Sequence, residues 1–192
     1  AFYSGAHLGE WGTRSIGDAD VLIAGEDEGD RLGHSVNWAG DVDGDGIADF
    51  ITGSYMQSSS DMSSGRGYLI LSGKLVRGED LNLPEAADYI WDGEAAEDQA
   101  GKRNVHAGDI DGDGLADIAT VALRNQDNGI GPDSTSERRG SGKFYILLSS
   151  DILAVPSGSV ASVADAAISW MGEAGGDAMG YGVNTMGDFD GD

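Results

Sequence analysis

Four aspartates fall within nine residues of the stretch GDVDGDGIADF, which spans residues 40–50. They occupy positions 1, 3, 5 and 9 of a loop, and a glycine at position 6, Gly46, permits a sharp left-handed bend that turns the carboxylates into one concavity. The residue at position 7 would turn its carbonyl inward and leave its apolar side chain for the core. Such an oxygen-only set suits Ca²⁺, whereas zinc favours His or Cys and magnesium keeps most of its water. The predicted ligands are Asp41, Asp43, Asp45, Asp49 and the carbonyl of Ile47.

The same pattern recurs twice further along the chain. The second copy is complete, with Asp109, Asp111, Asp113, Leu115 and Asp117 in the same positions. The third copy supplies Asp188, Asp190 and Asp192 before the sequence ends. A solvated Asp/Gly turn is the alternative, since these residues favour turns in any case. Repulsion among four like charges, together with the identical spacing in each copy, favours a bound cation.

An EF-hand or a dockerin repeat begins with a loop of the same spacing. An EF-hand needs a bidentate Glu at position 12, but Thr52 and Thr120 stand there in the first two copies. Both motifs also need a helix after the loop, and the residues that follow here predict a short apolar strand and a polar connection. The sequence therefore argues against both motifs.

The acidic loops belong to a longer repeat. A Gly-Glu pair lies sixteen residues before the first aspartate of each loop, and an aspartate and a glycine between them also keep their offsets. The period is 68 residues from the first copy to the second and 79 from the second to the third. The Gly-Glu pairs are Gly25-Glu26, Gly93-Glu94 and Gly172-Glu173, and the intervening aspartates are Asp30, Asp98 and Asp177.

Composition narrows the classes of partner. The 192 residues carry 34 acidic and 11 basic side chains, a net charge of −23, with 32 glycines and no cysteine. So acidic a surface argues against nucleic acid, and no apolar run is long enough to insert in a membrane. Abundant glycine without a three-residue period favours many tight turns between short strands.

Each repeat predicts four short strands and an all-β fold. In the first full copy these cover residues 35–39, 48–53, 67–72 and about 88–92, and a helix is plausible only over 160–167. Four-stranded antiparallel sheets at this period are typical of β-propeller blades. The expected units are the end of one blade (1–34), two complete blades (35–102 and 103–180) and the start of another (181–192). Trp91 and Trp170, at similar places in the fourth strands, are expected to pack between blades.

The repeat resembles the FG-GAP repeat of integrin α-subunit propellers and their bacterial relatives. That family's pattern runs Phe-Gly-x-Ser-Val, a calcium loop, an apolar strand and Gly-Ala-Pro. Here the first copy reads LGHSV at residues 32–36 and FITGS after the loop, at residues 50–54, so the flanks match in part. In the second copy both flanks are weaker. The resemblance implies a propeller with calcium loops between the first and second strands of each blade, on the face away from the usual ligand-binding face.

The functional expectation is a scaffold and not an enzyme. No Gly-x-Ser-x-Gly elbow is present and no catalytic residue stands out. Structural calcium would support an adhesion or ligand-binding segment of a secreted or cell-surface protein, joined to the remaining blades of its parent. The alternative is an accessory or catalytic propeller of a secreted hydrolase or phospholipase.

Two polar segments of unequal length join the second and third strands of their units. They run from Ser54 to Arg66 and from Arg124 to Ser141, and the second contains the adjacent pair Arg138 and Arg139. Loops of this kind on a rigid scaffold often carry recognition, so they are candidates for contacting a protein or carbohydrate partner. A tolerated surface insertion is an equally good interpretation.

Overall fold

The structure is a computed structural model that describes residues 15–58, 63–125 and 140–185. Strands dominate it, which confirms the prediction of an all-β protein. The strands are β1 (Ile23–Ala24), β2 (Ser35–Gly40), β3 (Asp49–Ser54), β4 (Arg66–Ile70), β5 (Leu81–Asn82), β6 (Tyr89–Asp92), β7 (Arg103–Gly108), β8 (Asp117–Ala122), β9 (Lys143–Leu147), β10 (Ser159–Ser162) and β11 (Ile168–Met171). The helical turns are η2 (Ile16–Asp18), η3 (Ser72–Lys74), α1 (Ser149–Leu153) and η4 (Val163–Asp165).

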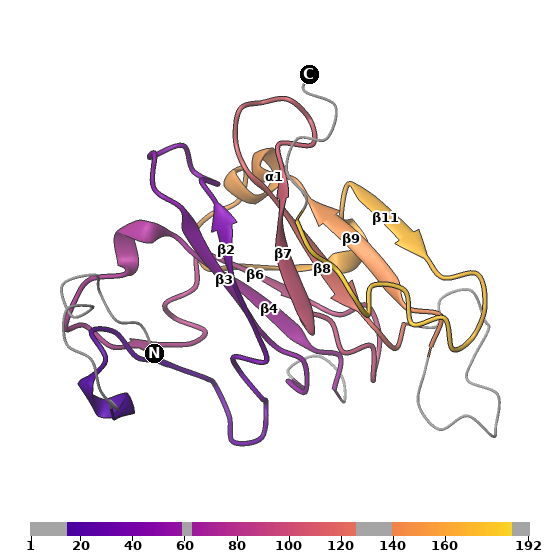
Figure 1. Ribbon diagram of the computed structural model, residues 1–192, viewed down its shortest axis with the longest axis horizontal. Helices are drawn as coiled ribbons and strands as arrows, with labels where there is room; N and C mark the ends of the chain where they lie inside the picture. The colour runs from indigo at the N-terminus through magenta and orange to yellow at the C-terminus, as the bar shows by residue number, and fades with distance from the viewer. Residues whose placement is uncertain (1–14, 59–62, 126–139, 186–192) are drawn as a thin grey trace.

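Two larger sheets repeat one topology. The strands β2, β3, β4 and β6 pair antiparallel in chain order, and so do β7, β8, β9 and β11. Strand β10 extends the first sheet by pairing parallel with β6. Figure 1 shows the sheets side by side, with β2 against β7. In the described part of the chain no sheet closes on itself.

The helix expected over residues 160–167 is wrong. Residues 159–162 form β10, and the following turn is a 3₁₀ helix that begins at Val163. Backbone hydrogen bonding to the edge of β6 stabilises the extended form, a tertiary contact that local sequence does not reveal. The short helix α1 was not predicted. None of the helices in the described ranges has the length and apolar character to cross a bilayer.

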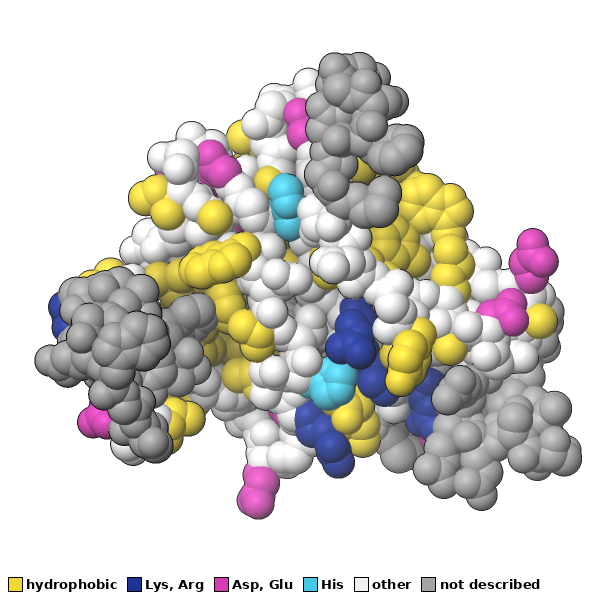
Figure 2. Space-filling model, in the orientation of Figure 1, with side chains coloured by type: hydrophobic (Ala, Val, Ile, Leu, Met, Phe, Trp, Pro, Cys, Tyr) yellow, Lys and Arg dark blue, Asp and Glu magenta, His cyan; other side chains and the backbone are white. Residues whose placement is uncertain are grey.

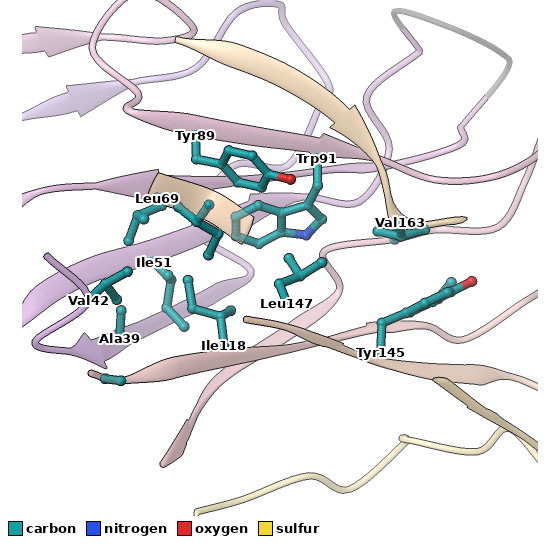
Figure 3. Packing of buried hydrophobic residues seen from close by; sticks show 14 residues of the cluster. Ala39, Val42, Ile51, Leu69, Tyr89, Trp91, Ile118, Tyr145, Leu147 and Val163 are labelled. Atoms are coloured by element: carbon teal, nitrogen blue, oxygen red, sulfur yellow. The ribbon is translucent and has the colours of Figure 1, made fainter. Parts of the chain in front are cut away.

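The main hydrophobic core lies between the two larger sheets. Figure 3 shows Ile51, Leu69 and Trp91 of the first sheet facing Ile118, Tyr145 and Leu147 of the second. Alternate residues of the same strands point the other way and form a second cluster on the outer face of the first sheet, around Phe50, Tyr68 and Ile90. Both faces of the first sheet are therefore covered, which explains why β3 and β4 are buried along their whole length.

The two tryptophans expected between units behave differently. Trp91 is completely buried in the main core, and its indole nitrogen donates to Thr120 Oγ1 of the neighbouring sheet at 3.1 Å. This confirms the prediction for Trp91. Trp170, at the corresponding place in β11, is 48% exposed and lies against Phe144 of its own sheet. No sheet beyond β11 is described, so its packing between units stays a prediction. The difference follows from position, because Trp91 faces the second sheet across the main core.

The packing of Trp91 requires a glycine at position 67. Gly67 lies opposite Trp91 in the β4–β6 register, and a Cβ on Gly67 would overlap the indole ring. We therefore expect Gly67→Ala to lower the free energy of unfolding by about 1–3 kcal/mol, the range for an overpacked core. Gly73→Ala is the matched control, since a Cβ there would meet no atom within 4 Å. Urea denaturation of both variants tests this, and equal stabilities would contradict it.

Candidate metal centres

Both acidic loops are organised by their own backbone. They join β2 to β3 and β7 to β8, and the two glycines of each loop adopt positive φ, 79° and 86° in the first and 77° and 90° in the second. In the first loop Asp41 accepts hydrogen bonds from Gly44 N at 2.8 Å and Gly46 N at 2.9 Å. Asp109 accepts the same two bonds, at 2.7 and 2.9 Å. The first carboxylate of each loop thus fixes the curl that brings the others inward.

Three aspartates converge in each loop. Oxygen atoms of Asp41, Asp43 and Asp49 lie within 4.8 Å of one another, and so do oxygen atoms of the second loop's equivalents, Asp109, Asp111 and Asp117. Each cluster offers only carboxylate oxygens, the ligands that hard divalent cations prefer. Two sites of the same composition could therefore hold a metal ion.

The carboxylates at position 5 of the two loops lie outside the three-aspartate clusters. Asp45 accepts from Ile47 N at 2.7 Å and from the Ser72 hydroxyl at 2.8 Å, and it is not a member of its cluster. Asp113 is likewise outside its cluster and accepts from Leu115 N at 2.8 Å. These two side chains fasten the loop to the end of the third strand.

The apolar residue at position 7 differs from expectation. The side chain of Ile47 is 61% exposed, so its assignment to the core is wrong. It lies at the tip of the loop, beyond the edge of both sheets, while Val42 in the same loop fills the core and is fully buried. Leu115, its counterpart, is half-buried. The third loop, with Asp188, Asp190 and Asp192, lies outside the described residues.

The carboxylate at position 9 is the most enclosed. Asp49 is completely buried and accepts from Val42 N and from Ser72 N, both at 2.8 Å. Asp117, equally buried, accepts from Ile110 N at 2.7 Å and Ser149 N at 2.8 Å. Each therefore joins the loop, the second strand and the end of the third strand in one contact.

Sequence reasoning missed the two serines of this arrangement. Ser72 and Ser149 close the third strands, in the matching runs YLILSG and FYILLSS. Those runs align as repeats, so their shared serine was the available signal. Its role depends on the fold, because the serines lie 23 and 32 residues beyond the aspartates that they contact.

The first loop concentrates negative charge around a buried group. Burial raises the pKa of Asp49, hydrogen bonds from Ser72 N and Val42 N oppose the rise, and the charges of Asp43 and Asp45 add to it. In the described residues no Lys or Arg pairs with any of the eight carboxylates of the two loops. The ionised form of this cluster therefore calls for a cation from outside the chain.

Three mostly buried carboxylates elsewhere pair with a cationic side chain. Glu26 and Asp92, both mostly buried, pair with Arg66 at 3.0 and 2.6 Å, and Tyr68 donates to Glu26 at 2.7 Å. Glu94, after the last strand of the first sheet, pairs with Lys143 of the second sheet at 2.7 Å. The first two Gly-Glu pairs thus mark a mostly buried ion pair that joins one unit to the next, a role that their spacing alone did not reveal.

The repeated aspartates between these pairs and the loops are also structural. Asp30, Asp98 and Asp177 each accept a hydrogen bond from the backbone N–H three residues earlier, at 2.8–3.1 Å. They close a turn before the first strand and are not metal ligands. The repeat therefore separates turn-forming aspartates from the loop clusters.

The two candidate centres are also joined through the backbone. Ala116 N in the second loop donates to the Asp41 carbonyl at 2.9 Å. A Cβ at Gly40, where φ is 84°, would collide with Ala116 and His106, so only glycine permits this approach. The loops are neighbours along one edge of the two sheets.

Comparison with known proteins gives no family. No protein-family model matches the sequence, and no significant match to a curated protein is found. Function is therefore inferred from the repeat and its geometry.

The contrast between paired and unpaired buried carboxylates yields a stability test. Arg66→Met should leave Glu26 and Asp92 without a cation in a mostly buried setting, and we expect a loss of about 3–5 kcal/mol in the free energy of unfolding. Arg124→Met is the control, because its partner Glu97 is 57% exposed and 3.5 Å away, so the change should cost no more than about 1 kcal/mol. Chemical denaturation without metal measures both. Equal losses would refute the structural role of this ion pair.

Proposed function

We propose that the chain is a calcium-stabilised segment of an FG-GAP-type β-propeller, in a secreted or cell-surface protein that serves adhesion or ligand binding. One observation carries the proposal: in each of two loops of the same spacing three carboxylates converge within 4.8 Å, and none of them pairs with a Lys or Arg in the described residues. The repeated strand order in the two sheets supports a series of blades.

The donor atoms favour calcium among divalent cations. Three carboxylates and nearby backbone carbonyls provide oxygen ligands, and neither loop contains the His or Cys that would favour zinc. Asp41, Asp43 and Asp49 would hold the ion in the first loop, and Asp109, Asp111 and Asp117 in the second. The Asp45 and Asp113 carboxylates and the carbonyls of Ile47 and Leu115 would complete the shells. In this proposal Asp188, Asp190 and Asp192 contribute in the same way to a third site.

Calcium in these loops would be structural. Bound calcium neutralises the loop carboxylates and so holds the first strand of each unit to the second and third. Extracellular calcium modules typically bind with dissociation constants of about 10⁻⁴–10⁻³ M, which suits the millimolar calcium outside cells. Recognition of a protein or carbohydrate partner would then fall to loops elsewhere on the scaffold. The segments 54–66 and 124–141 stay candidates for it, although residues 59–62 and 126–139 lie outside the described structure.

Calcium should stabilise the protein through both loops. At a free concentration of about 100 times its dissociation constant, each occupied site adds about 2.7 kcal/mol to the free energy of unfolding. We expect calcium to raise the melting temperature well above that in EDTA and above that in equal magnesium. Asp41→Asn and Asp109→Asn should each remove part of the calcium-dependent rise.

Glu79→Gln serves as the control, because it removes one exposed negative charge outside the loops. Its calcium-dependent rise should equal that of the parent chain. Differential scanning calorimetry with and without calcium measures all of these. The proposal fails if calcium leaves the melting temperature unchanged, or if the rise is the same in the loop variants and the control.

A further inference from the structure

A polar cavity of about 330 Å³ lies at the end of β2 and β7 opposite the acidic loops. It is lined by the first residues of both strands and by the segment 181–183, and its side chains include His34, Arg103 and Tyr181. The acidic loops follow the last residues of the same two strands, so the cavity and the candidate metal centres are at opposite ends. Its volume is near the lower end of the range for small-ligand sites, about 300–1,000 Å³.

One cation without an acidic partner, Arg103, lines this cavity, and two more lie near its lining residue His34. Of the eight Lys and Arg residues that the structure describes, five form ion pairs: Arg66, Lys74, Arg77, Arg124 and Lys143. The other three, Arg31, Lys102 and Arg103, pair with no carboxylate in the described ranges, although acidic residues outnumber basic ones by 34 to 11. In so acidic a chain, unpaired cations that lie together are unexpected unless something else neutralises them.

The three cations lie close to one another around Tyr55 and His34. The Lys102 ammonium is 4.5 Å from the centre of the Tyr55 ring, the Arg31 guanidinium 6.0 Å and the His34 ring 4.7 Å. Arg103 follows Lys102 in the chain and lines the cavity beside His34. Figure 2 shows Lys and Arg side chains gathered around a histidine on this face.

The positive charges of this group repel one another. Burial lowers the pKa of Lys102, and the positive charges of Arg124, Arg103 and Arg31 lower it further. An anion in the cavity would relieve the repulsion. The group therefore has the electrostatic character of a site for a negatively charged ligand.

The cavity's side chains indicate the class of anion. Arg103 donates through Nε to the Tyr181 carbonyl at 3.5 Å, and its terminal nitrogens make no hydrogen bond to a described residue. A guanidinium fork matches the planar pair of oxygens of a carboxylate and also binds sulfate. The Tyr181 side chain, 63% exposed, offers an aromatic face at the rim against which a sugar ring could pack.

We propose that the cavity bounded by His34, Arg103 and Tyr181 binds an acidic sugar, with Arg103 contacting its charged group and Lys102 attracting it from outside the lining. The proposal specifies the ligand of the proposed scaffold function, and in that respect rests on it. No metal takes part in the contact, so calcium binding and sugar binding can be measured separately.

Isothermal titration calorimetry with three tetrasaccharides tests the proposal. The probes are a hyaluronan tetrasaccharide, which carries only carboxylates, a sulfated galactan tetrasaccharide, which carries only sulfates, and the neutral galactan of the same length. We expect at least one acidic probe to bind, with an affinity that falls as salt rises, and the neutral one not to bind. The tighter acidic probe identifies the source of the anion.

Variants then locate the contact. Arg103→Gln should weaken binding about tenfold, as expected for loss of a charge-assisted hydrogen bond. Lys102→Gln should weaken it less, because Lys102 lies outside the lining and acts only through its charge. Arg77→Gln, which removes a cation paired elsewhere, should leave the affinity unchanged. Unaltered melting temperatures would show that all three variants fold.

The proposal is overturned by any of four results. These are no binding of either acidic probe, equal binding of the neutral probe, full affinity in Arg103→Gln, or a tetraglutamate peptide that binds as tightly as the sugars. Calcium titration of the same sample separates the two proposals. Calcium uptake without sugar binding refutes only the cavity, and sugar binding without calcium uptake refutes only the metal centres.

Discussion

A buried aspartate at the start of the second strand holds each unit together. Asp49 and Asp117 accept one backbone N–H from their own loop and one from the end of the third strand. Both carboxylate oxygens are thereby oriented, and the loop must close around them. This contact determines the conformation of the loop. It also fixes where β3 or β8 begins and how the chain continues after β4 or β9. Because the group is ionisable and enclosed, it also creates the demand for positive charge.

Positive charge for the carboxylates comes from two sources. Where consecutive units meet, the glutamate of the Gly-Glu pair binds a cationic side chain of the next unit, and the pairing adapts to its surroundings. Arg66 spans both Glu26 and Asp92, whereas in the second unit Met171 stands in place of Asp92 and the shorter-reaching Lys143 pairs with Glu94 alone. At the loops no side-chain cation is present, and a bound ion takes that role in our proposal. At the opposite end of β2 and β7 the imbalance is reversed, since cations lie there without acidic partners.

The sequence predicted the features that repetition and local chemistry determine. The loop spacing located Asp41, Asp43 and Asp49, and short glycine-bounded apolar runs located the four strands of the first complete unit to within about two residues. It could not reveal partners supplied by distant segments, such as Ser72 for Asp49 or β6 for β10. It also placed Ile47 in the core, since composition alone does not distinguish an apolar residue at a loop tip from Val42 five positions earlier.

The central claim is that the two acidic loops are calcium sites. A crystal structure of the protein grown with calcium, with anomalous scattering recorded, tests it most directly. The account predicts one anomalous peak in each loop, with oxygens of Asp41, Asp43 and Asp49, or of Asp109, Asp111 and Asp117, at about 2.3–2.6 Å. Loops that keep the conformation described above and show no peak in millimolar calcium would contradict it.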